Sequence, residues 1–378
     1  MPCFDREEET ADVWRRIDGE QNLLMLAPRR IGKTVLLNRL HEMATQQRYR
    51  AIILDVEGFH DEKDLFRQCC AAIQEELSTG GSVMAAFTHR LKQIVRGSAT
   101  EGSDWRQILV QTDWQVFADQ LFSHLDDHGE EPPWLILVDE LPVFLKSLHS
   151  AEGRASIEEF LYWLRGVRQK YRNVRWLYAG SIGLDTVARE QNVEGALNDL
   201  HPVTIEPFTE EIAAAFLVNI AERRNCTFEE QAVRHTIDRL GWLSPYYLER
   251  IAEDACLNSD RGTAIGIRAV DLAMDQLLDL SKRIYWSSWR EHLDRNFSEP
   301  TRGHLYAILE FVAQSKVGAT WNLILTSMNV DSDKLTQIEL RNLIDTLVSD
   351  GYLIRGNDQL YKFRMNLLRE WWLRYVVL

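Results

Sequence analysis

Residues 22–44, NLLMLAPRRIGKTVLLNRLHEMA, decide the fold of this chain. An apolar run leads into a short basic loop that ends Gly32-Lys33-Thr34, and an amphipathic helix follows directly. A strand, a tight loop and a helix in this order are typical of a P-loop, in which backbone N–H groups and the start of the helix face one phosphate. The residues expected to bind nucleotide here are Ala27, Pro28, Arg29, Arg30, Ile31, Gly32, Lys33, Thr34 and Val35.

Two side chains of the loop have expected roles. Lys33 is expected to reach the β and γ phosphates, and the Thr34 hydroxyl is expected to ligate Mg²⁺. One residue departs from the motif, because Ala27 stands where the first glycine is usual. A left-handed alanine costs ~1–2 kcal/mol, so either position 27 is not left-handed or the loop tolerates that cost. The alternative is a chance GKT in an ordinary turn between a strand and a helix.

Short apolar runs recur between helical segments and predict a parallel sheet. Such runs, flanked by helices, indicate strands that are buried on both faces. The five runs are Leu23–Leu26, Ala51–Val56, Trp134–Val138, Val174–Ala179 and Val203–Ile205. We therefore expect an α/β fold with a five-stranded parallel sheet, interrupted by an irregular insertion at about 78–115 with one helix near 87–95.

The third run ends in two acids, Asp139 and Glu140. A carboxylate at the carboxyl end of a core strand can hold Mg²⁺ and its water shell, the role we expect for Asp139. A neighbouring carboxylate can orient and deprotonate the attacking water, the role we expect for Glu140. The alternative is a strand that merely ends in solvated acids.

The fourth run ends AGSIG at 179–183, where a polar side chain would lie beside the γ phosphate. This gives Ser181 an expected catalytic role as a sensor of hydrolysis. The same pattern resembles a hydrolase nucleophile elbow, with His201 or His235 as the downstream base. That alternative leaves the P-loop and the acidic pair unexplained.

Composition narrows the class of protein. The chain has 378 residues, 45% of them apolar, and a net charge of −14, which argues against nonspecific binding of nucleic acid over the whole surface. No run approaches the ~20 apolar residues of a membrane helix, and the acidic start does not resemble a signal peptide. The five cysteines form no CxxC pair, so we expect a cytoplasmic protein with no membrane contact.

The strand signal stops after residue 206. Thr209 is expected to cap a helix through Ala221, more helices follow to about Leu280, and 296–303 reads as a linker. Beyond it, helices are expected at 304–314 and 321–328, and a third is expected after a Thr336/Glu339 capping box. A hairpin at 352–363 completes the pattern of a winged helix-turn-helix. The expected domains are an ATPase core at 1–206, a helical lid and connector at 207–295, and the winged helix at 296–378.

These motifs together resemble the AAA+ ATPases of the archaeal-type, STAND-related group over nearly the whole chain. The similar segments are FDREEE at 4–9, APRRIGKT at 27–34, DVEG at 55–58, AGSIGL at 179–184, IEPFTEEIAAAFL at 205–217, GWLSPYYL at 241–248 and LREWW at 368–372. The resemblance implies ATP and Mg²⁺ as cofactors, with Phe4 and Arg6 near the adenine. It also implies that Pro245 packs near the nucleotide and couples it to the lid. No arginine finger can be assigned, and Arg189 is the best candidate.

The main hypothesis is a slow or partner-stimulated ATPase that acts as a nucleotide-driven switch, in a homo-oligomer or on a protein partner, in defence or genome maintenance. The third helix of the winged helix carries Arg341 among several acids, a poor match for DNA, whereas the wing offers Arg355, Lys362 and Arg364. DNA contact and protein docking therefore both stay open. The alternatives are a DNA-binding regulator with a structural nucleotide site and a scaffold that does not hydrolyse ATP.

Overall fold

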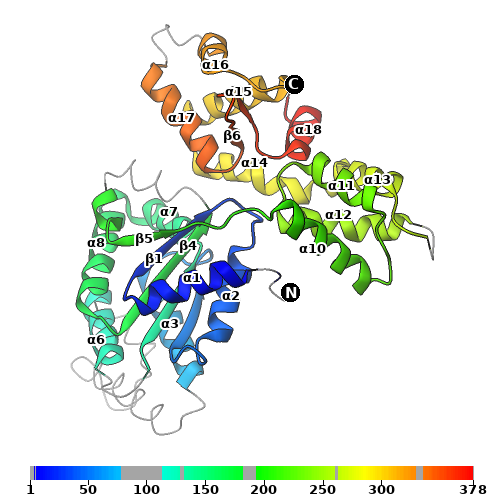
Figure 1. Cartoon of the computed structure of the whole chain (residues 1–378). Helices are drawn as coiled ribbons and strands as arrows, with labels where there is room; N and C mark the ends of the chain where they lie inside the picture. Colours follow the sequence, from blue (N-terminus) through cyan, green and yellow to red (C-terminus); the bar gives the residue numbers. More distant parts are fainter. Residues whose placement is uncertain are drawn as a thin grey trace. The chain divides into compact units, whose positions relative to one another are not determined.

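The computed structural model describes residue 4 and residues 6–77, 113–127, 132–181, 193–259, 263–328 and 335–377. It divides into two compact units, which are described one at a time (Figure 1). The first unit comprises Met1–Ala27 and Lys33–Ile205, and the second comprises Pro28–Gly32 and Glu206–Leu378. The helix expected near 87–95 lies outside the described residues.

The first unit is built on a five-stranded parallel sheet in the order β2-β3-β4-β1-β5, which confirms the predicted α/β fold. The strands are β1 (Asn22–Ala27), β2 (Arg50–Asp55), β3 (Trp134–Asp139), β4 (Val174–Ser181) and β5 (Leu200–Val203). The helices are α1 (Glu7–Asp18), α2 (Lys33–Met43), α3 (Glu62–Leu77), α6 (Trp114–Asp126), α7 (Leu141–Glu152), α8 (Arg154–Lys170) and the 3-10 turn η1 (Glu194–Leu197).

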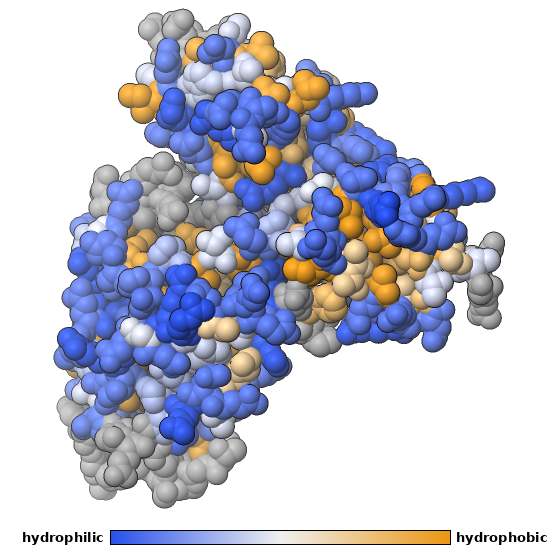
Figure 2. Space-filling model, viewed as in Figure 1, coloured by the Kyte–Doolittle hydropathy of each residue, from blue (hydrophilic) through white to orange (hydrophobic). Residues whose placement is uncertain are grey.

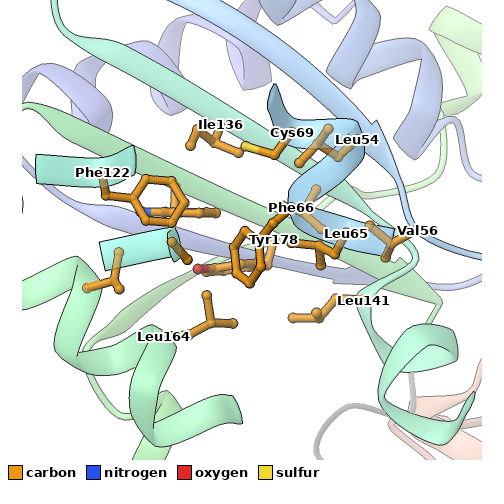
Figure 3. Close-up of a cluster of buried hydrophobic side chains, with 14 of the residues drawn as sticks. Leu54, Val56, Leu65, Phe66, Cys69, Phe122, Ile136, Leu141, Leu164 and Tyr178 are labelled. Carbon is orange, nitrogen blue, oxygen red and sulfur yellow. The ribbon is translucent and has the colours of Figure 1, made fainter. Parts of the chain in front are cut away.

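Helices cover both faces of the sheet. Successive side chains of a strand point to opposite faces, and Ile136 of β3 joins a buried cluster with Phe66 of α3 and Leu164 of α8 (Figure 3). Leu135 and Leu137, the neighbours of Ile136, are also fully buried but lie outside that cluster. The helices α1 and α2 contact the sheet without contributing to the cluster, which places them on the other face. This double burial explains the continuous apolar runs in the sequence.

The last strand of the sheet differs from the prediction. β5 is Leu200–Val203, three residues earlier than the run expected at 203–205. Among the described residues it pairs only with β1, and its central residues His201 and Pro202 are exposed. An edge strand of this kind lacks the apolar run that reveals a central strand. Ile205 is buried, but it follows the strand.

The second unit is mainly helical. Its elements are α10 (Glu210–Arg223), α11 (Glu230–Leu240), α12 (Pro245–Asn258), α13 (Ile267–Leu277), the 3-10 turn η2 (Leu280–Lys282), α14 (Ile284–Asn296), α15 (Thr301–Gln314), α16 (Trp321–Ser327), α17 (Gln337–Ser349), β6 (Leu353–Arg355), β7 (Tyr361–Phe363) and α18 (Asn366–Tyr375). The strands β6 and β7 form an antiparallel hairpin. Three helices and a hairpin therefore follow α14, in the order that the sequence predicted.

Capping residues set the ends of these helices. The Thr209 hydroxyl accepts a hydrogen bond from the Ile212 N–H at the start of α10, and Thr336 and Glu339 form the predicted capping box of α17. The expected linker at 296–303 is wrong in extent, because α15 already begins at Thr301. The Glu299 carboxylate accepts a bond from the Gly303 N–H, which keeps that glycine in the first turn of the helix.

Buried aromatic side chains connect α12 and α14 to the C-terminal elements within this unit. Tyr247 stacks on Trp286 with ring centroids 4.9 Å apart, and the Trp289 indole N–H donates to the Tyr247 hydroxyl at 2.8 Å. The Tyr352 hydroxyl in turn donates to the Trp289 carbonyl, and Trp286 lies against Trp371 of α18. These tryptophans thus pack at joints between helices within the unit.

Candidate nucleotide site

The loop between β1 and α2 contains two residues in the left-handed region, Arg30 (φ 68°) and Gly32 (φ 103°). Ala27 is the last residue of β1 and pairs with Ser181 of β4, so its backbone is extended. Alanine at this position therefore carries no left-handed cost. A Cβ on Gly32 would meet no atom within 4 Å, so the backbone angle, rather than crowding, favours glycine there.

Lys33 closes the loop. It is the first residue of α2, and its side chain is buried, with 7% of its surface exposed. The ammonium group donates a 2.8 Å hydrogen bond to the Ala27 carbonyl. A buried ammonium is stable only with such partners. The bond places the positive charge at the carboxyl end of β1, where the sequence predicted phosphate binding.

The Thr34 hydroxyl donates a 2.7 Å hydrogen bond to Oδ2 of Asp139. Asp139 ends β3, and β4 lies between β3 and β1 in the sheet, so the contact links two segments far apart in the chain. A hydroxyl and a carboxylate oxygen side by side are the donor types that Mg²⁺ uses beside a phosphate. The residues present therefore fit this metal ion.

Asp139 is buried, and its second oxygen Oδ1 accepts a hydrogen bond from the Glu140 N–H at 3.0 Å. Burial raises the pKa of the Asp139 carboxyl above its ordinary value. The hydrogen bond from Thr34 acts against this shift, whereas the Glu140 carboxylate adds to it. A nearby cation, such as a bound metal ion, would favour the charged form.

Sequence reasoning gave no role to Asp55, a third carboxylate at the same edge of the sheet. Asp55 ends β2 directly beside Asp139 in the strand register, and its charge also raises the pKa of Asp139. Its own Oδ1 accepts a bond from the Glu57 N–H at 3.1 Å. The available signal was its place at the end of an apolar strand, the same signal that identified Asp139.

Glu140 adopts a left-handed conformation with φ 58°. A non-glycine residue in this region is strained, and such residues concentrate at functional sites. Two residues further on, Pro142 of α7 packs closely on β4, because a Cβ on Gly180 would lie 2.4 Å from its Cδ. Ser181 follows Gly180 as the last residue of β4, but its side chain is outside the described set.

The two residues expected near the adenine lie at the start of α1. Phe4 is half-buried, and Arg6 is buried and pairs with Glu9. Arg6 lines a hollow of about 430 Å³, together with residues from the second half of α2 such as Arg39 and Met43. Contact of Phe4 and Arg6 with a base stays a prediction.

The tip of the loop, Pro28–Gly32, belongs to the second unit. There the Ser244 hydroxyl donates to the Arg30 carbonyl at 2.5 Å, and the Arg30 guanidinium lies 4.2 Å from the centroid of the Tyr246 ring. Pro245 is the first residue of α12 and stands between these two contacts in the sequence. Pro28 and Ile31 are buried, while Arg29, Arg30 and Val35 are half-buried.

The other candidate constellations gain little support. His235 contacts Asp271 at 2.7 Å. Arg189 lies outside the described residues. Within the described ranges, no group of three or more His, Cys, Asp or Glu residues could hold a metal ion.

Comparison with known proteins finds a matching family and similar folds. Residues 15–187 match the family described as AAA domain. The fold is similar to the Walker-type ATPase PABY2304 of Pyrococcus abyssi, at 18% identity, covering 98% of this chain and 95% of that one, with a TM-score of 0.68. It is also similar to the ORC2 protein of Aeropyrum pernix, solved in ADPNP–ADP complexes, at 13% identity, covering 98% and 93%, with a TM-score of 0.56. No curated protein matches the chain in sequence.

The first unit therefore has an α/β fold with a five-stranded parallel sheet, similar to that of a P-loop AAA+ core. Across the described ranges, no helix is both long enough and apolar enough to cross a membrane.

Proposed function

We propose that this chain is an ATP-binding, Mg²⁺-dependent ATP hydrolase that acts as a nucleotide-driven conformational switch. One observation carries the proposal, namely the 2.7 Å contact between the Thr34 hydroxyl and the Asp139 carboxylate. A chance GKT sequence has no reason to place its threonine on an acid at the end of another core strand. A P-loop does, because both side chains serve the same metal ion.

The residues of the first unit divide the chemistry among them. Lys33 binds the β and γ phosphates as a buried point charge, and Thr34 and Asp139 hold Mg²⁺. The metal ion, when bound, supplies positive charge that offsets the charge of the phosphates. Glu140 orients the attacking water and accepts its proton, and Ser181 responds to the γ phosphate from the end of β4.

The parts outside the catalytic edge bind the rest of the nucleotide and transmit its state. Phe4 and Arg6 take the adenine side, and Pro245 couples the nucleotide to the helices that act as a lid, at 207–295. The segment 296–378 forms a winged helix. ATP favours one arrangement of these parts, hydrolysis favours another, and the difference in affinity between the two states drives the switch.

We propose a protein partner, which includes further copies of this chain, rather than DNA for the C-terminal part. The Arg341 guanidinium lies 5.1 Å from the centroid of the Trp321 ring, and Lys362 pairs with Asp358 at 2.7 Å. These basic groups are therefore engaged within the chain instead of forming an open basic face. Ile338 of α17 is 75% exposed, and apolar side chains appear among hydrophilic ones on the visible surface (Figure 2).

Two variants test the ATPase proposal. Lys33→Ala is expected to abolish ATP binding in calorimetry, whereas Lys316→Ala, a change of an exposed lysine, is expected to bind ATP normally. Glu140→Gln is expected to retain binding and to lower turnover about 10²- to 10⁴-fold, the usual contribution of a general base. Glu158→Gln on the exposed face of α8 is its matched control. Normal ATP affinity in Lys33→Ala would overturn the site.

The same measurements separate the alternatives. Tight nucleotide binding without turnover in the wild-type chain would identify a scaffold that does not hydrolyse ATP. A gel shift with DNA that weakens as salt is added and does not depend on ATP would identify a DNA-binding regulator.

A further inference from the structure

The loop tip of the P-loop is held by residues of α12 that no motif assigns to phosphate binding. The tip, Pro28–Gly32, forms part of the second unit. Its Arg30 carbonyl accepts a 2.5 Å hydrogen bond from Ser244, and its Arg30 guanidinium lies over the ring of Tyr246. Both partners come from the start of α12, more than two hundred residues along the chain from the loop (|i−j| = 214).

Capping of α12 does not explain the presence of a serine at position 244. Ser244 is the N-cap residue of α12, and a serine there ordinarily accepts a hydrogen bond from the first turn. Here the side chain makes no capping bond, although it is fully buried. Its hydroxyl instead donates to the Arg30 carbonyl in the loop, so Ser244 stabilises the loop rather than the end of the helix.

The contact acts on a strained backbone. Arg30 is left-handed with φ 68°, and a non-glycine residue persists in that conformation only where its surroundings hold it. The hydrogen bond to its carbonyl and the ring beneath its guanidinium provide such a hold. Arg30 lies directly before the residues whose N–H groups are to face the phosphates, so its conformation decides where those groups point.

A second contact holds the same tip from the end of α17. Gly351 follows that helix with φ 84°, and a Cβ there would lie 2.8 Å from Cβ of Pro28. Pro28 therefore packs directly against the backbone of Gly351. Two elements of the second unit thus contact the tip, one at Pro28 and the other at Arg30.

We propose that Ser244 and Tyr246 are positioning residues for phosphate binding, which hold Arg30 so that the loop is preformed. The inference rests on the proposed nucleotide site and adds two residues that position its loop. Because linkage is reciprocal, a bound phosphate must also strengthen the contact between Arg30 and α12. The strength of the contact at the start of α12 therefore depends on whether phosphate is bound in the loop.

The first test measures the affinity of purified full-length variants for a fluorescent ADP analogue, together with their melting temperatures. Ser244→Ala removes one hydrogen bond and is expected to weaken binding about 3- to 10-fold. Tyr246→Leu removes the ring and is expected to weaken binding about 2- to 5-fold, whereas Tyr246→Phe keeps the ring and binds normally. Thr209→Ala, which deletes the genuine N-cap of α10, is expected to lower the melting temperature and leave affinity unchanged.

The second test follows hydrogen exchange at the start of α12 in the wild-type chain. Protection there is expected to rise when ADP is added, and Ser244→Ala is expected to remove most of that rise. Normal affinity in both Ser244→Ala and Tyr246→Leu, or exchange that ignores ADP in a chain that binds it, would overturn the inference. Lys33→Ala separates the two proposals, because normal binding by that variant overturns the nucleotide site itself.

Discussion

Thr34 and Asp139 lie 105 residues apart in the sequence, yet the hydroxyl of one donates a 2.7 Å hydrogen bond to the carboxylate of the other. The contact forms because α2 begins at the end of β1, while Asp139 ends β3 at the same edge of the sheet. Parallel strands bring all their carboxyl ends to one edge, where open α/β sheets bind their ligands. The pair is therefore a consequence of topology, and its chemistry can be tested directly.

Thr34→Ala should weaken the binding of Mg²⁺ at the nucleotide site. The variant loses one metal ligand but keeps Lys33, so ATP should still bind weakly in the absence of the metal. Its apparent Mg²⁺ affinity should fall about tenfold or more, as for changes that disturb metal ligands. A Mg²⁺ titration of a bound fluorescent ATP analogue measures this. Thr326→Ala, a change in α16 of the second unit, is the control, and an unaltered titration of Thr34→Ala would contradict the assigned ligand.

Gly180→Ala should destabilise the first unit. The added Cβ would lie 2.4 Å from Cδ of Pro142, a distance that forces β4 or α7 to move. Overpacking of this kind costs about 1–3 kcal/mol in the free energy of unfolding. Since Pro142 follows Glu140 closely, turnover should fall as well. Urea denaturation and an ATPase assay measure the two effects.

Gly166→Ala is the matched control. Gly166 lies within α8 on its exposed side, and a Cβ there would meet no atom within 4 Å. Alanine in a helix interior is favoured over glycine by roughly 0.5–1 kcal/mol, so this variant should gain stability. A loss in both variants would mean that the cost at Gly180 is not specific to its contact with Pro142.

The fold was predictable from the sequence where strands are buried on both faces, because such strands consist of continuous apolar residues. The strands β1 to β4 appear as continuous apolar runs, and all six residues of β3 are buried. The edge strand β5 was misplaced because two of its four residues are exposed, so no such run marks it. The short linker before α15 was overestimated because Gly303 signals a break, whereas a bond from its N–H to Glu299 keeps it helical.

The residues of the candidate site were predictable from the sequence, but the contacts that hold its loop in place were not. The GKT sequence and the acids after β3 identify Lys33, Thr34 and Asp139 without a structure. The sequence could not say that Ala27 is extended, because that follows from its pairing with Ser181. Nor could it give Ser244 a partner at Arg30, because a hydrogen bond over such a separation leaves no pattern in the chain. A motif identifies residues that are close together in the chain. Contacts between residues far apart in the chain can be found only from the folded structure.

Asp199→Asn should destabilise the first unit in a manner that depends on pH. Arg168 is almost fully buried, and its guanidinium donates two hydrogen bonds of 2.8 Å to the Asp199 carboxylate. Burial raises the pKa of Asp199, but the hydrogen bonds and charge of Arg168 lower it by more, so its pKa is below the ordinary value. Removing one partner of such a pair costs about 3 kcal/mol.

The sign of the pH effect follows from the lowered pKa. The charged pair contributes its full stability above the ordinary carboxyl pKa of about 4, and the contribution is lost as pH falls through the lower folded value. The difference between wild type and Asp199→Asn should therefore be constant near neutral pH and shrink in acid. Glu230→Gln breaks a pair whose side chains are 77% and 74% exposed, and it should change stability by less than about 1 kcal/mol. A difference that grows in acid would contradict this account.

Tyr352→Phe should weaken the joint between α14 and the C-terminal elements. Tyr352 is fully buried, and its hydroxyl donates to the backbone carbonyl of Trp289. The indole N–H of Trp289 donates in turn to the Tyr247 hydroxyl. Phenylalanine keeps the ring contacts and removes only the hydroxyl, so the free energy of unfolding should fall by about 1 kcal/mol, the net value of one hydrogen bond. Denaturant unfolding followed by tryptophan fluorescence measures the change. Tyr375→Phe, at a partly exposed ring, should change stability by less than about 0.5 kcal/mol. Equal effects of the two variants would show that the bond to Trp289 adds no stability and that ring packing alone maintains the joint.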